Sequence, residues 1–60
     1  MKTTAARKMV ATMTADERCA VFAMVQAAQE KTGLVGLAVL STLPTGTQTK
    51  AEAVLRWMGA

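Results

Sequence analysis

The chain has 60 residues, of which 52% are hydrophobic and 18% are charged, and its net charge is +3. So short a chain forms one domain at most, spanning residues 1–60, and buries only about 60% of the surface that its unfolded form exposes. The composition excludes a disordered chain, because disordered segments combine low hydrophobicity with high charge. We therefore expect a small folded domain that needs additional stabilisation.

Cross-links by disulfide or metal are not expected to supply that stabilisation. Cys19 is the only cysteine, and the chain has no histidine. The acidic residues are few and scattered: Asp16, Glu17, Glu30 and Glu52. A structural zinc or calcium site needs a denser set of ligands. We therefore expect no metal and no cofactor, which leaves close packing, self-association or a protein partner.

Two helices are predicted in the N-terminal half. In residues 4–13, apolar side chains recur at helical spacing on one face, formed by Ala5, Ala6, Met9, Val10 and Met13. A longer helix is predicted over residues 15–32. Thr14 and Glu17 match a capping box before it, in which each side chain accepts a hydrogen bond from the other residue's amide. Gly33 follows, and glycine readily adopts the left-handed conformation that ends many helices.

Residues 34–43 are ambiguous between a helix and a strand. Leucine recurs at every third position, as Leu34, Leu37, Leu40 and Leu43. Short apolar runs bounded by glycine and proline occur in buried helices and in buried strands alike. The leucine and alanine content favours a helix. The alternative is a strand over residues 35–42, which would make the fold α+β.

The last helix is predicted over residues 50–58. Thr49 and Glu52 match a second capping box, and Glu52 and Arg56 have the favourable i,i+4 order of an ion pair. A proline and a glycine mark residues 43–48 as the loop before this helix. The predicted architecture is therefore an all-α bundle of three to four short helices, assembled as a homodimer.

The helix predicted over residues 15–32 is apolar on opposite sides. One side is bulky and contains Val21, Met24, Val25 and Ala28, with Phe22 beside them. The other side is built from small side chains, Ala20, Ala23 and Ala27, with Cys19 beside them. A surface helix of a monomer needs only one apolar stripe, so the second stripe favours contact with another chain. Two alternatives stay open: the terminal segments wrap both sides, or the alanines face solvent as good helix formers.

These patterns predict a site for protein contact. Its residues are the close-packing Ala20, Ala23 and Ala27 and two larger anchors, Met24 and Trp57. Trp57 belongs to the last helix, where it is either a lid on the core or an anchor for a partner. The predicted function is a small regulatory or inhibitory adaptor that acts by protein–protein contact and associates with itself.

No catalytic site is predicted. Cys19 follows Arg18 near the start of a helix, where a thiolate is favoured, but a nucleophilic cysteine needs a base and the chain has no histidine. We expect Cys19 to be a small buried hydrophobic residue. The carboxylates of Asp16 and Glu17 are explained by their place at a helix start. The chain is therefore predicted not to be an enzyme.

Binding of DNA or RNA is the alternative function. The last two segments could form a helix–turn–helix in which the helix over residues 50–58 meets the nucleic acid. The contacts would come from Lys2, Arg7, Lys8, Lys50 and Arg56. The loop over residues 43–48 is longer than this motif usually has, and the last helix offers few exposed side chains for reading bases.

Membrane activity as a cationic peptide is a third alternative, and a membrane partner is not expected. The apolar run over residues 34–43 would span about 15 Å as a helix, half of a bilayer core. Membrane-active helices usually carry more lysine and an aromatic anchor. A secretory signal would have to use the apolar run over residues 19–28, behind acidic residues that signals rarely contain. We therefore expect the protein in the cytoplasm.

Overall fold

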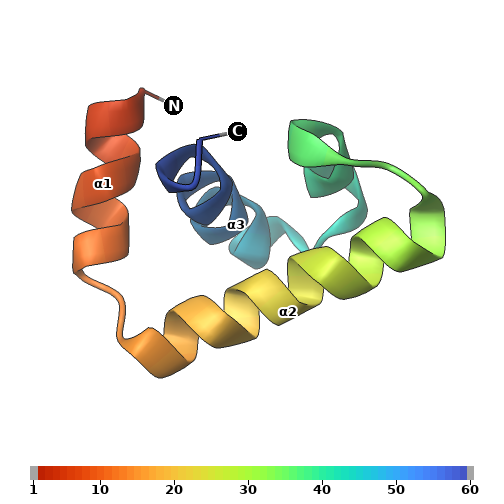
Figure 1. Ribbon diagram of the computed structural model, residues 1–60, viewed down its shortest axis with the longest axis horizontal. Coiled ribbons are helices and arrows are strands. Elements are labelled where there is room, and N and C mark those ends of the chain that lie inside the picture. The colour runs from red at the N-terminus through yellow and green to blue at the C-terminus, as the bar shows by residue number, and fades with distance from the viewer. Residues whose placement is uncertain (1, 60) are drawn as a thin grey trace.

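Four helical elements follow one another in the computed structural model, which describes residues 2–59. They are α1 (Thr3–Ala11), α2 (Ala15–Thr32), the 3₁₀ helix η1 (Gly36–Thr42) and α3 (Thr45–Trp57). α2 is the longest and forms the base of the molecule in Figure 1, with α3 above it between α1 and η1. No strand occurs within residues 2–59. The predicted all-α bundle is confirmed, and the alternative strand over residues 35–42 is wrong.

The core is built around α3, which contacts each of the other three elements. The side chains of this core are mostly alanine and valine. The buried residues are Ala6, Val10, Met13, Val21, Val25, Val39, Leu43, Ala51, Ala53, Val54 and Leu55. Three consecutive residues of α3, Ala53 to Leu55, belong to this set, so the helix is buried around most of its circumference.

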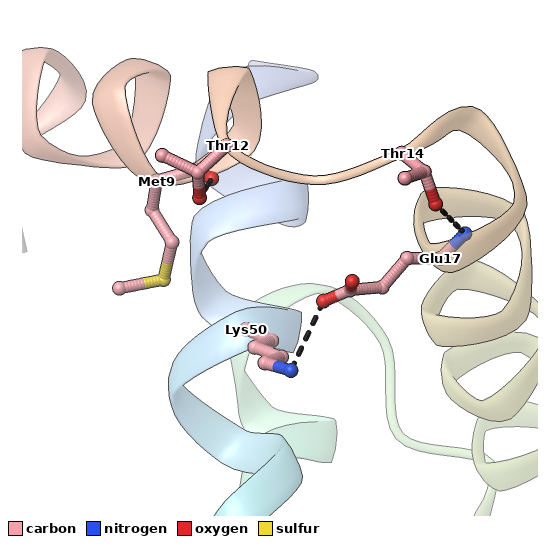
Figure 2. A network of polar contacts seen from close by, with 5 residues as sticks. All are labelled: Met9, Thr12, Thr14, Glu17 and Lys50. Atoms are coloured by element: carbon pink, nitrogen blue, oxygen red, sulfur yellow. Dashed lines mark hydrogen bonds and ion pairs between the residues drawn. The ribbon is translucent and has the colours of Figure 1, made fainter.

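α1 is a short helix that docks on α3. Ala6 and Val10 lie in the core, and this contact matters because a helix of nine residues is marginal in water by itself. The helix ends where the hydroxyl of Thr12 donates to the carbonyl of Met9 at 2.7 Å (Figure 2). The chain then turns and buries Met13. The helix predicted over residues 4–13 is confirmed, but its predicted end is wrong, because α1 stops at Ala11 and Met13 lies in the turn that follows.

The predicted boundaries of α2 are confirmed at both ends. The Thr14 hydroxyl accepts from the Glu17 amide at 3.1 Å (Figure 2), and Gly33 adopts a left-handed φ of 75° while its amide donates to Gln29. The predicted second hydrogen bond of the capping box, from the Thr14 amide to the Glu17 carboxylate, is wrong. The carboxylate of Glu17 does not turn back to Thr14, because it pairs with the ammonium group of Lys50 on α3 at 3.0 Å (Figure 2). This ion pair joins α2 to α3.

η1 resolves the ambiguity of the leucine-rich segment. A 3₁₀ helix has three residues per turn, so side chains three positions apart lie on one face. Leu37 and Leu40 are partly buried and Leu43 is buried, in line with that spacing, while Val39 is fully buried. The predicted helix therefore exists as a 3₁₀ helix. The leucines at every third position match the three residues per turn of this helix type.

The predicted start of the last helix is wrong. α3 begins at Thr45, so Thr49 lies inside it and caps nothing. The carbonyl of Pro44 accepts from the amides of Thr47 and Gln48, and the Gln48 side chain donates to the Leu43 carbonyl at 3.0 Å. Proline is well suited to a helix start, because its φ is already helical and it lacks an amide that would need a partner.

The segment expected to be a loop, residues 43–48, is therefore mostly helix. The glycine at position 46 costs about 1 kcal/mol inside a helix, and burial of the apolar side of α3 offsets that cost. The predicted ion pair of this helix is confirmed, with Arg56 Nε 3.0 Å from a Glu52 carboxylate oxygen.

Substitution of the two threonines tests these helix starts. Thr14→Ala removes the cap of α2 and should lower the free energy of unfolding by about 1 kcal/mol. Thr49→Ala is the matched control and should leave stability unchanged or raise it slightly, because alanine is the better helix former inside α3. Urea denaturation followed by circular dichroism measures both. An equal loss in the two variants would mean that α3 starts at Lys50.

A pair of valines tests the core. Val25 is fully buried, whereas Val35 is 73% exposed. Val25→Ala should cost about 2 kcal/mol, a large part of the roughly 3–9 kcal/mol expected for a domain of this size. Val35→Ala should change the unfolding free energy by less than about 0.5 kcal/mol. Similar losses at both positions in urea denaturation would contradict the burial of Val25 in the core.

Candidate protein-contact surface

Large hydrophobic side chains remain exposed on α2 and α3 and in the short segments that follow these two helices. Met24 on α2 is 41% exposed and Trp57 at the end of α3 is 48% exposed. Exposed leucine and valine also follow α2, at Leu34 and Val35, and Met58 follows α3. Single exposed hydrophobic residues are ordinary, so the informative feature is where they adjoin other apolar surface.

α2 and the C-terminal end of α3 border an apolar groove of about 230 Å³. Its lining consists of Ala15, Arg18, Cys19, Phe22, Val54 and Trp57, which we call the Trp57 groove. Four of these residues belong to α2 and follow the spacing i, i+3, i+4 and i+7, which marks one face of a helix. The groove is thus a continuous stripe of α2 closed on one side by α3.

Arg18 holds Trp57 at this groove. Its guanidinium carbon lies 5.9 Å from the centre of the indole ring, within the range of a cation–π contact. Its Nη1 also donates to the carbonyl of Met13 at 3.1 Å, at the turn between α1 and α2. Arg18 therefore connects that turn to the end of α3 and orients an indole of which about half stays exposed.

The small-residue side of α2 is uncovered. Ala20, Ala23 and Ala27 are all exposed, while Val21 and Val25 on the other side lie in the core. The alternative in which the terminal segments wrap both sides of this helix is therefore wrong. We call Ala20, Ala23, Met24 and Ala27 the outward face of α2. Its contact with a partner stays a prediction.

Only some of the predicted contact residues come together. On α2, Cys19 lines the edge of the Trp57 groove nearest to Ala23, so the groove adjoins one edge of the outward face. Met24 lies on the opposite edge, away from Trp57. Sequence reasoning missed the groove residues Arg18 and Phe22, although their helical spacing from Ala15 and Cys19 was a usable signal.

Cys19 was expected in the core, and this prediction is wrong. The residue is exposed and its thiol is free. Val21 and Val25 direct the buried side of α2, and the helical rotation turns Cys19 well away from them. The side chain therefore forms part of the exposed lining of the Trp57 groove.

Not all of the five cationic residues predicted for nucleic-acid contact are available to bind phosphate. Lys2, Arg7 and Lys8 are exposed on or beside α1. On α3, Lys50 pairs with Glu17 and Arg56 pairs with Glu52. Two of the five cations therefore already have an anionic partner.

Other kinds of site find no support in the described part of the chain. Within residues 2–59, His, Cys, Asp and Glu side chains nowhere gather in a group of three that could hold a metal. No helix in the same range is both long and apolar enough to cross a bilayer. Comparisons with family models, curated proteins and solved structures found no match. The surface itself is therefore the basis for inferring function.

The exposure of Cys19 predicts rapid thiol labelling. Ellman's reagent should modify the folded protein within about tenfold of the rate seen in urea, because the thiol needs no unfolding to react. The control is Val25→Cys combined with Cys19→Ser. Its buried thiol should react more than about 100-fold slower than in urea, through the open state alone. Comparable protection of both thiols would contradict the orientation of α2.

Proposed function

We propose that this protein is a small regulatory or inhibitory adaptor, without enzymatic activity, that binds another protein through the Trp57 groove and also associates with itself. The observation that carries the proposal is a half-exposed tryptophan held by Arg18 at an apolar groove. Tryptophan and arginine are the side chains most enriched among residues that dominate binding energy at protein interfaces.

The chemistry of the groove indicates what kind of segment it accepts. Its volume of about 230 Å³ is below the usual range for pockets that hold a cofactor or another small molecule. One or two apolar side chains of a partner would fill it. Arg18 adds a positive charge at the rim, which favours a partner segment with a carboxylate next to its apolar anchor.

The exposed free thiol supports the cytoplasm as the compartment. An unpaired, accessible cysteine persists where glutathione and thioredoxin keep thiols reduced, whereas an oxidising compartment would couple it to other thiols. This reading agrees with an adaptor that meets its partner inside the cell.

Binding of DNA or RNA is the second candidate, and the exposed cations Lys2, Arg7 and Lys8 favour it. The ion pairs of Lys50 and Arg56 weigh against it, because a phosphate would have to displace a carboxylate from each of them. A nucleic-acid complex would also weaken steeply with salt, which contact at an apolar groove would not.

Photo-crosslinking at the groove tests the proposed function. Benzoylphenylalanine replaces Trp57 in one variant and the exposed Thr4 on α1 in the matched control. In cells, the first should form a discrete crosslink to another protein that survives extraction at about 0.5 M salt. Equal capture by both variants, or capture of nucleic acid that is lost as salt rises, would reject the adaptor. Circular dichroism checks that both variants fold.

A further inference from the structure

The side of α2 that faces away from the core ends in opposite charges. Asp16 lies in the first turn of the helix and Lys31 in its last turn, and both are exposed. Neither forms an ion pair within residues 2–59. At 3.6 residues per turn, these two residues and the alanines at positions 20 and 27 lie within about 60° around the helix axis. They therefore form one stripe, acidic at one end, basic at the other and uncharged between.

This stripe is complementary to itself when one copy is reversed. Asp16 and Lys31 lie equally far from the midpoint of α2, and so do Ala20 and Ala27. A two-fold axis through that midpoint places Asp16 of each copy beside Lys31 of the other. The same axis places Ala20 of each copy beside Ala27 of the other. One symmetry operation therefore satisfies the charges and the small side chains together.

The opposite orientation would be unfavourable. In a parallel pair in register, Asp16 would face Asp16 and Lys31 would face Lys31, so like charges would repel at both ends. The antiparallel pair also sets the negative end of each helix dipole beside the positive end of the other. Alanines at the crossing let the helix axes approach to about 8 Å, the close limit for packed helices.

Met24 occupies the centre of this arrangement. It lies next to the midpoint of α2, on one edge of the stripe, and is 41% exposed. Across the two-fold axis, each Met24 would meet its own copy, and a flexible thioether adapts well to such a gap. Ala23 would meet its own copy on the other edge.

We propose that the outward face of α2 binds a second copy of this chain, with the two α2 helices antiparallel and Asp16 of each copy paired with Lys31 of the other. The proposal rests on the proposed function, because it names one of the partners and assigns it a surface. It leaves the Trp57 groove free, since the groove lies on the flank of α2 and not on the stripe.

The dimer is expected to be weak. An 18-residue helix is about 27 Å long, and one helix pair buries less than the roughly 1,200 Å² of a standard interface. Sedimentation equilibrium should therefore show a monomer–dimer transition as the protein is concentrated from about 1 µM to 1 mM.

Charge reversal tests the pairing. Asp16→Lys alone and Lys31→Asp alone should each raise the dissociation constant at least about tenfold, because each creates two like-charge contacts per dimer. The double variant restores opposite charges and should return to within about threefold of the original value. Circular dichroism at low concentration separates loss of the dimer from loss of the helix.

Disulfide trapping tests the register without changing charge. In a Cys19→Ser background, Ala20→Cys protein mixed with Ala27→Cys protein should oxidise mainly to the mixed dimer. Ala23→Cys should crosslink readily to its own copy, since both lie next to the axis. Oxidation of Ala20→Cys to itself in preference to the mixed dimer would overturn the register.

A chain that stays monomeric up to about 1 mM overturns the dimer, and so does a dimer indifferent to both charge reversals. Failure here differs visibly from failure of the proposed function. A monomer that still crosslinks a partner from position 57 rejects the dimer alone. A dimer with the expected register and no crosslink at position 57 supports the inference and rejects the adaptor.

Discussion

Burial of α3 between α1, α2 and η1 is the constraint on which the rest of the structure depends. Each of those elements is apolar on the side that meets α3, and α1 and η1 are too short to persist alone. With two aromatic residues in the chain, the core is assembled from alanine, valine and a few longer side chains. Such a core is thin and covers only one side of α2.

Contacts at the turn between α1 and α2 connect the start of α2 to α3. Thr14 caps α2, Glu17 reaches Lys50 on α3, and Arg18 connects the Met13 carbonyl to the ring of Trp57. These contacts involve partly exposed groups, and each contributes little by itself. Together they join the start of α2 to α3 next to the residues that line the Trp57 groove.

The two parts of the exposed surface suit different kinds of contact. The Trp57 groove is concave. Its tryptophan and arginine are typical of the residues that dominate binding energy between two different proteins. The outward face of α2 is built mainly from small side chains and lies between opposite charges, which suits a symmetric antiparallel helix pair. Because the two lie on neighbouring sides of one helix, a dimer would present two grooves at once, which strengthens binding to a partner with two sites.

The sequence alone determined the helical content, both ends of α2 and the absence of disulfide staples, because caps, glycine stops and apolar spacing act within a few residues. It also located the small-residue side of α2. Only the tertiary structure decided that Glu17 pairs across helices with Lys50 and that Cys19 is exposed. Each of these depends on which side of one element meets another, and that choice follows from how the whole chain packs around α3. The groove at Trp57 has the same origin, because its walls come from residues more than thirty positions apart.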